Sequence, residues 1–245
     1  MLKVVVWLHF LSDGQFMNPI KTQKFVLVTG ATGGIGSEVC RELHLKGYAP
    51  IVGYRRGKAA ALKLAEEVGG CICRFDMANL LEIDTAIDSF ASLPGQIVGA
   101  VHCASPPPKL AIFSRISEED LLFFWQQNVL GAHRLFVRLV KKFLRKARSG
   151  TIVVVTSGGM GGESKSAMPS LGAYTISKYG LSGVIALLAA EHTWLKVSTV
   201  SPGFTDTKML KAFDERFIEQ IAKNNPLHKP SEIAVEIVTQ FTGMV

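Results

Sequence analysis

Tyr174 and Lys178 are the first candidates for chemistry in this chain, within the stretch LGAYTISKYGLSGVIALLAAE at 171–191. The stretch has an amphipathic helical pattern, and residues four apart lie next to each other on one face of a helix. One interpretation is a core tyrosine with the aliphatic stem of a lysine beside it. The other is an acid–base pair, in which the ammonium lowers the pKa of the phenol from its ordinary value of about 10. The pair alone does not decide between these interpretations.

Short β-branched runs alternate with longer helical patterns along the rest of the chain. Strands are predicted at 24–30, 49–54, 71–75, 97–102, 151–157 and 195–203. Helices are predicted at 34–47, 57–68, about 79–90, about 117–147, 171–191 and 231–241. Almost wholly apolar strands are buried on both faces, and strand–helix alternation indicates parallel strands joined by right-handed crossovers. We therefore expect an α/β fold with a doubly wound parallel sheet, a Rossmann fold of about six main strands with helices on both faces, which binds ligands at the carboxyl ends of the strands.

The segment VTGATGGIGSEV (28–39) joins the first predicted strand to the first predicted helix. Glycines there allow a tight turn and a close approach to a pyrophosphate, and the helix N-terminus adds free N–H donors. Any tight strand–helix turn can require glycine, but the position after the first strand favours a dinucleotide site. The candidate cofactor contacts in this turn are Gly30, Thr32, Gly33, Gly34, Ile35 and Gly36.

The second predicted strand ends in GYRRGK (53–58), where a carboxylate would bind the hydroxyls of an adenosine ribose. The chain has Tyr54, Arg55 and Arg56 instead, and guanidinium groups suit a ribose 2′-phosphate. We therefore predict NADP, with NAD as the less favoured cofactor; the alternative is that these arginines are merely solvated. Asp76 and Met77 follow the third strand, where an adenine would lie. Asp76 could accept a hydrogen bond from the adenine amine or could cap the next helix.

With these segments in order, the chain resembles the single-domain short-chain dehydrogenases/reductases over about residues 24–240, and by general appearance their 3-oxoacyl carrier-protein reductases. The matching motifs are TGATGGIG (29–36), Asp76, Asn128 in QNVLG, Ser157 in VVVTSGG, YTISK (174–178) and SPGFTDT (201–207). The resemblance implies four catalytic residues. Tyr174 would exchange a proton with the substrate oxygen, Lys178 would also bind the nicotinamide ribose, Ser157 would polarise the carbonyl, and Asn128 would hold a helix distortion and a proton-relaying water.

Further cofactor contacts follow from the same resemblance, namely Ala104, Pro202, Gly203 and Thr205. Without it, Asn128 would be taken as solvent-facing, Ser157 as a cap of local backbone, and 201–207 as an ordinary turn.

The chain departs from the family pattern at three places. Most relatives have Asn-Asn-Ala-Gly where this chain has His102, Cys103, Ala104 and Ser105; we interpret His102 as structural and expect Ser105 to add bulk near the adenosine ribose. The loop 158–173 is longer than usual, so Ser164 or Ser166 could reach inward in place of Ser157, and Glu163 and Lys165 could recognise a substrate charge or be solvated. After the helix at 231–241 the family's final strand is missing, which weakens the case for a tetramer.

Composition limits the class of protein. The chain has 245 residues, 48% of them hydrophobic and 19% charged, which suits one globular domain with a sizeable core. The net charge of +7 suits anionic ligands. No dense basic stripe with interleaved aromatics is present, and the basic cluster at 141–150 is interpreted as a helix end, so no nucleic-acid partner is expected.

The cysteines lack metal-ligand spacing, so no metal is expected; they are Cys40, Cys71, Cys73 and Cys103. Free thiols suit the cytoplasm.

The N-terminal residues 1–22 are predicted to be an extension outside the fold, and 23–245 a single NAD(P)-binding catalytic domain. The apolar run at 4–11 is too short to cross a bilayer, and we expect no membrane partner.

The sequence therefore predicts an NADP-dependent oxidoreductase acting on a small-molecule carbonyl or alcohol, with an acyl thioester among the candidates. A nicotinamide-binding sensor or scaffold is the alternative, but such proteins often lose the tyrosine or the lysine. A sugar-nucleotide epimerase or dehydratase is disfavoured because little chain follows residue 203. The long helix at 117–147 has an apolar stripe, so we expect a homodimer, with a tetramer as the other possibility.

Overall fold

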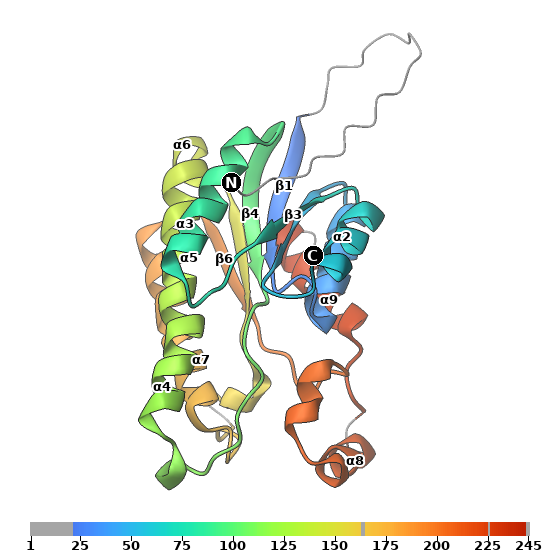
Figure 1. Ribbon diagram of the computed structural model, residues 1–245, viewed down its shortest axis with the longest axis vertical. Coiled ribbons are helices and arrows are strands. Elements are labelled where there is room, and N and C mark those ends of the chain that lie inside the picture. The colour runs from blue at the N-terminus through green and yellow to red at the C-terminus, as the bar shows by residue number, and fades with distance from the viewer. Residues whose placement is uncertain (1–21, 163–164, 225, 244–245) are drawn as a thin grey trace.

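A computed structural model of the protein describes residues 22–162, 165–224 and 226–243 (Figure 1). Its strands are β1 (Gln23–Thr29), β2 (Ala49–Tyr54), β3 (Cys71–Arg74), β4 (Gly95–His102), β5 (Thr151–Val155) and β6 (Lys196–Val200). Its α-helices are α1 (Gly34–Leu45), α2 (Lys58–Glu67), α3 (Leu80–Ser89), α4 (Glu118–Trp125), α5 (Gly131–Leu139), α6 (Arg145–Ala147), α7 (Gly172–Glu191), α8 (Glu215–Asn224) and α9 (Pro230–Thr242). Short 3₁₀ helices cover Phe90–Ser92, Phe113–Arg115, Gly158–Met160 and Lys208–Ala212, and π-helical turns cover Gln126–Leu130 and Val140–Leu144.

The strands form one six-stranded parallel sheet in the order β3-β2-β1-β4-β5-β6. The chain winds from β1 outward to β3, crosses back to β4 beside β1, and then winds the other way to β6. The prediction of a doubly wound α/β sheet is confirmed. Its direction of winding reverses between β1 and β4, where Thr29 pairs with His102, and such a switch point opens a crevice for ligands.

Apolar side chains cover both faces of this sheet. On one face, Phe25 and Leu27 of β1 belong to a core with side chains of α3, α5 and α7. On the other face, Val26 and Val28 belong to a core with side chains of α1, α2 and α9. Figure 1 shows the same two layers, with α3, α5 and α7 on one side of the strands and α2 and α9 on the other. The strand ends that carry the site are therefore fixed between two packed layers.

The predicted helix at 117–147 is one helical segment from Glu118 to Ala147, but it is not regular. A π-helical turn at Gln126–Leu130 separates α4 from α5. Such turns insert an extra residue per turn and are frequent at functional sites. This turn contains Asn128, the residue for which the family resemblance implies a helix distortion.

Helix α7 is, by length and composition alone, apolar enough to cross a membrane, and it is the one such helix within the described part of the chain. Its residues Ala173, Ser177, Leu181 and Ile185 are buried inside the protein. A core helix of a globular domain has the same composition, and the packing of α7 against the sheet identifies it as one.

Candidate active site

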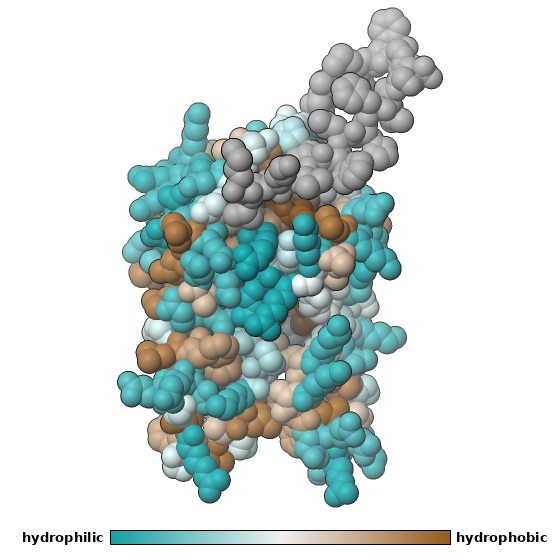
Figure 2. All heavy atoms as spheres, viewed as in Figure 1, coloured by the Kyte–Doolittle hydropathy of each residue, from teal (hydrophilic) through white to brown (hydrophobic). Residues whose placement is uncertain are grey.

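A cavity of about 1240 Å³ lies at the carboxyl ends of the strands, at the switch point between β1 and β4. It exceeds the roughly 300–1,000 Å³ of pockets that hold drug-sized ligands. In the space-filling view, the molecule is notched between the part that carries α4 and the part that carries α8 (Figure 2). The cavity wall includes every cofactor candidate of the sequence analysis and Ser157: Gly30, Thr32, Gly33, Gly34, Ile35, Gly36, Tyr54, Arg55, Arg56, Asp76, Met77, Ala104, Ser157, Tyr174, Lys178, Pro202, Gly203 and Thr205.

The glycine-rich turn between β1 and α1 leaves no room for a side chain at Gly30 or Gly36. Gly30 has φ +64°, and a Cβ there would lie 2.9 Å from the backbone of Ala104. A Cβ on Gly36 would lie 2.3 Å from the carbonyl oxygen of Gly30. Helix α1 begins directly after Gly33, so its free N–H groups and positive dipole end face the cavity. This geometry fits a pyrophosphate.

At the far end of the cavity, two adjacent arginines differ in how they are held. The Arg55 guanidinium donates to Gln127 Oε1 at 3.3 Å and lies 3.7 Å from Asp76 Oδ2. Arg56 is exposed and forms no ion pair with any residue that the structure describes. Arg56 is therefore the guanidinium with more freedom to receive an added phosphate.

The hydrogen bonds of Asp76 show whether it caps the helix that follows β3. Asp76 Oδ1 accepts a hydrogen bond from the Ala78 N–H at 2.9 Å, while Asn79 caps α3 through Leu81 and Glu82. Asp76 is thus not the cap of that helix. Tyr54 is buried in β2, and burial raises its pKa.

Tyr174, Lys178 and Ser157 lie close together in the cavity wall. Tyr174 is only 5% exposed. The Lys178 Nζ donates to the Val155 carbonyl at 3.1 Å and lies 5.6 Å from the centre of the Tyr174 ring. The Ser157 Oγ accepts a hydrogen bond from the Gly159 N–H at 3.2 Å, so the capping role considered for it is present. Its hydroxyl also lies within hydrogen-bonding reach of the Tyr174 phenol, so its proton points to the place where a substrate oxygen would bind.

The electrostatics of this trio differ from the sequence-based expectation. The pKa of Tyr174 is raised above its ordinary value because burial disfavours the phenolate, and the hydroxyls of Ser157 and Ser105 offset this only in part. Burial also lowers the pKa of Lys178 to about 8. The net shift in the pKa of the phenol in the chain by itself is therefore upward, because desolvation by burial is its largest cause.

Asn128 does not line the cavity but is linked to it through a residue that the sequence analysis did not single out. It is fully buried, and its Nδ2 donates to Ser177 Oγ at 2.9 Å. The Ser177 hydroxyl in turn donates to the carbonyl oxygen of Tyr174 at 2.7 Å. The Asn128 Oδ1 has no partner among the described residues. Asn128 therefore joins the π-helical turn to the first turn of α7 and does not face solvent.

Ser105, at the family's glycine position, lies near the phenol of Tyr174. Its hydroxyl is close enough to Tyr174 to lower the pKa of the phenol. The Ser105 Oγ also donates to the Pro106 carbonyl at 3.3 Å. The proline run at 106–108 restricts the backbone beside it, so a second hydroxyl, besides that of Ser157, is held beside the phenol.

His102 ties β1 to β4, as expected for a structural residue. Its Nδ1 lies 2.9 Å from Thr29 Oγ1, and the same hydroxyl accepts a hydrogen bond from the Ala104 N–H at 3.1 Å. The other ring nitrogen, Nε2, is a buried atom with no partner in the described structure. Burial and the Lys178 charge lower the pKa of His102 to about 3.

This buried imidazole predicts an acid-sensitive fold. Between pH 6.5 and about 3 the unfolded chain binds a proton on His102 that the folded chain does not, so stability falls as the pH falls. From pH 7.5 to 5 the free energy of unfolding should drop by about 2 kcal/mol through this group alone. Urea unfolding at the two pH values, in the native chain and in His102→Asn, measures the difference. An equal pH dependence in both proteins would contradict the assignment.

The enlarged loop before α7 contributes its exposed residues Lys165 and Ser166 to the cavity wall. Glu163 and Ser164, the other two candidates in this loop, lie outside the described residues. Within residues 22–162, 165–224 and 226–243, no group of three or more His, Cys, Asp or Glu side chains is placed to hold a metal ion.

Comparison with known proteins identifies what this arrangement resembles. The family model for short chain dehydrogenases matches residues 24–217. An acetoacetyl-CoA reductase from Acinetobacter is 31% identical over 228 residues, which cover 88% of this chain and 89% of the relative. The 3-oxoacyl-[acyl-carrier-protein] reductase FabG of Staphylococcus epidermidis is 28% identical over 218 residues, covering 85% and 86% of the two chains. A crystal structure of an actinorhodin polyketide ketoreductase with NADPH superposes with a TM-score of 0.78 at 25% identity, covering 89% of this chain and 90% of that one.

Proposed function

Because this chain belongs to the short-chain dehydrogenase family, we propose that it transfers hydride between NADP and a small-molecule carbonyl or alcohol, with Tyr174 as the acid and base. The chain is an NAD(P)-dependent oxidoreductase of this family. The observation that carries the finer proposal is the cavity that runs from the glycine-rich turn to the Tyr174–Lys178–Ser157 trio.

The proposed mechanism uses these three side chains in turn. A bound nicotinamide supplies the hydride. Ser157 donates a hydrogen bond to the substrate carbonyl oxygen, and Tyr174 delivers its proton to the same oxygen. Lys178 keeps a positive charge beside the phenol and offers its ammonium to the nicotinamide ribose. Asn128 and Ser177 do not contact the substrate in this mechanism; they position Tyr174 by hydrogen bonds that reach its backbone carbonyl.

NADP is proposed over NAD on the basis of Arg56 and Arg55. Both arginines line the cavity beyond the end of β2. Asp76 is the one carboxylate near them in the described cavity wall, and its Oδ2 lies 3.7 Å from the Arg55 guanidinium. The solved ketoreductase that resembles this chain is a complex with NADPH, which supports the same choice.

Fluorescence titration with NADPH and NADH, followed by a screen of carbonyl substrates for loss of nicotinamide absorbance, tests the proposal. NADPH is expected to bind more tightly and to support turnover. Tighter binding of NADH would reject the cofactor assignment. NADPH binding without turnover of any carbonyl would instead favour the alternative of a nicotinamide sensor or scaffold, which the retained Tyr174, Lys178, Ser157 and Asn128 argue against.

A 3-oxoacyl thioester is the proposed type of substrate. Two relatives bear names that describe reduction of acetoacetyl-CoA and of a 3-oxoacyl carrier protein. Both names describe a ketone two carbons from a thioester, which is the kind of carbonyl that the Ser157–Tyr174 pair would polarise. We also propose that the enzyme works in the cytoplasm, where its free cysteines would stay reduced.

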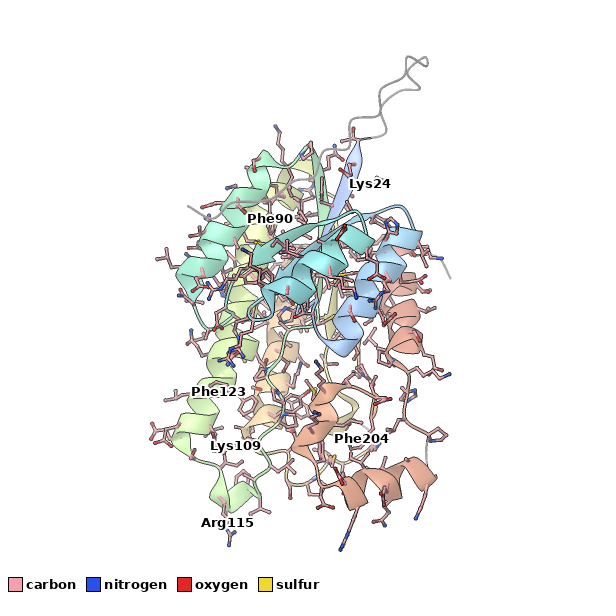
Figure 3. The ribbon with its side chains drawn as sticks, turned by 45° about the vertical axis from the view of Figure 1, so that its right-hand side comes forward. Lys24, Phe90, Lys109, Arg115, Phe123 and Phe204 are labelled. Carbon is pink, nitrogen blue, oxygen red and sulfur yellow. The ribbon has the colours of Figure 1, made fainter. Side chains whose placement is uncertain are left out.

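A homodimer is proposed from an exposed apolar surface on α4 and α7. Leu122, Phe123 and Trp125 of α4 and Tyr179 and Leu187 of α7 are all more than one third exposed; Figure 3 labels Phe123 on α4, on the side of the molecule away from α8. The two helices are in contact at Gly180, where a Cβ would lie 2.8 Å from the Trp125 ring. Exposed apolar patches of this kind commonly mark interaction surfaces.

Light scattering at micromolar concentration tests this surface. The expected mass is twice the 26.6 kDa of the chain, and Leu187→Glu should shift the protein to monomer because it places a charge in the contact. Leu45→Glu is the matched control, since Leu45 is 75% exposed on α1 outside this surface. A native protein that is only monomeric would overturn the proposal, and a fourfold mass would indicate the tetramer.

A further inference from the structure

The substrate side of the cavity is lined mainly by apolar side chains from four separate segments. Pro108 and Leu110 follow β4, Met168 and Leu171 precede α7, Phe204 follows β6, and Phe217 belongs to α8. All of them lie on the same cavity wall as Tyr174. A molecule whose carbonyl reaches the phenol is therefore surrounded by apolar groups beyond that carbonyl.

Three phenylalanines form the part of this wall opposite α4. The Phe204 ring lies edge-on to Phe213, with ring centres 5.5 Å apart, and edge-on to Phe217 at 6.0 Å. Phe213 and Phe217 are stacked at 5.8 Å. Figure 3 labels Phe204 in the segment between β6 and α8. The three rings are partly buried, so they keep apolar surface that a ligand could cover.

The phenylalanine cluster is continuous with the catalytic phenol. Phe213 packs against a buried group formed by Phe124, Leu171, Ala173 and Tyr174. Leu171 belongs to the same buried group as Tyr174, and Leu171 and Phe213 both line the cavity. A ligand at Tyr174 therefore lies near apolar side chains that extend toward the three rings.

Charges on this side of the cavity lie at its rim. Lys165, Lys208 and Asp214 line it, and all three are exposed. Lys178 is the one buried charged side chain in the described part of the protein, and its Nζ is held by the Val155 carbonyl. A carboxylate or phosphate placed beside Phe213 would lose water without gaining a partner, which is costly.

Resting on the proposed function, we propose that the substrate carries an apolar acyl chain of six or more carbons, and that the Phe204–Phe213–Phe217 cluster binds this chain beyond the carbonyl. The thioester end then faces the rim, where Lys165 and Lys208 meet the solvent. Each methylene buried against the rings should raise kcat/KM by roughly two- to fourfold.

A chain-length series measures this directly. The probes are 3-oxoacyl N-acetylcysteamine thioesters of four, six, eight and ten carbons, with saturating NADPH. From four to eight carbons we expect kcat/KM to rise about 15- to 250-fold, mostly through KM. A change of less than about twofold across the series would overturn the inference and leave the proposed function intact. Absence of NADPH-dependent turnover with every member would reject the proposed function, and the inference with it.

A variant of the cluster adds a second, independent test. Phe217→Ala should lower kcat/KM more for the ten-carbon than for the four-carbon substrate. The ratio of the two kcat/KM values, ten-carbon over four-carbon, should fall by about tenfold. Phe113→Ala is the matched control, because Phe113 is 88% exposed and lies off the cavity wall, and its ratio should not change. Equal losses at both chain lengths in Phe217→Ala would contradict recognition by the cluster. The wild-type series decides the question even if this variant folds poorly.

Discussion

Replacing Tyr174 with phenylalanine is expected to lower kcat by about 1,000-fold while the fold and NADPH binding are preserved. The substitution removes one buried hydroxyl that lies among Ser157, Ser105 and Lys178, and a positioned general acid typically contributes about 10²- to 10⁴-fold to a rate. The aromatic ring remains, so its edge-on packing against Phe124, at 6.0 Å between ring centres, is retained. Steady-state kinetics, circular dichroism and NADPH titration on the same preparation provide the measurement.

The control for this variant is Tyr48→Phe, which makes the same chemical change away from the cavity wall. Its kcat should match the native value. Turnover by Tyr174→Phe at more than about one tenth of the native rate, with the fold intact, would falsify the assignment of Tyr174 as the acid. A loss of NADPH binding in the variant would show that the phenol acts through the cofactor site and not on the substrate.

The raised pKa of Tyr174 also predicts how the rates of the two reaction directions depend on pH. The phenol is protonated there, which is the form that carbonyl reduction needs, whereas alcohol oxidation needs the phenolate. In the native enzyme, the protonation state of Tyr174 should therefore not limit carbonyl reduction near neutral pH. The rate of alcohol oxidation should increase as the pH is raised. In Tyr174→Phe this rise in the oxidation rate should be absent.

Sequence periodicity was sufficient to predict the sheet, because the central strands contain apolar runs and helical patterns separate them. The strand β2 was predicted at 49–54 and is found at Ala49–Tyr54. Helix α8 was not predicted, although Phe217, Ile218 and Ile221 have the spacing of one helix face. The segment has only 10 residues, and a short periodic run is a weak signal for a helix.

The sequence was sufficient to predict which residues gather in the candidate site, but not the pKa values of its ionisable groups. The glycine-rich turn, Arg55, Asp76 and Ser157 follow strand ends, and the carboxyl ends of parallel strands meet at one edge of a sheet whatever the detailed packing. The pKa of Tyr174 depends instead on how completely the folded chain buries the phenol, which is a tertiary property. The link from Asn128 through Ser177 to the Tyr174 carbonyl likewise requires two helices to be in contact, and spacing along either helix does not reveal it.

Removing the Arg56 guanidinium is expected to weaken NADPH binding by about 10- to 100-fold and to leave NADH binding within about twofold. Hydrogen bonds to a charged group are worth about 1.5–3 kcal/mol, and the two cofactors differ only by the 2′-phosphate. Arg55→Ala should have a smaller effect on the ratio, because the Arg55 guanidinium is already engaged by Gln127 and Asp76. Fluorescence titration of both cofactors against Arg56→Ala and Arg55→Ala measures the two ratios.

The control for lost charge is Arg145→Ala, an exposed arginine of α6 that does not line the cavity. It lowers the net charge by the same amount, so any general electrostatic attraction of NADPH to this basic chain should weaken equally in Arg145→Ala and Arg56→Ala. A specific contact predicts that only Arg56→Ala changes the ratio of the two dissociation constants, and that raising the salt concentration narrows the difference between native protein and variant. If Arg56→Ala weakened the binding of NADPH and of NADH equally, the guanidinium would contact a part that the two cofactors share. Any preference for NADPH over NADH would then come from other residues of the cavity wall.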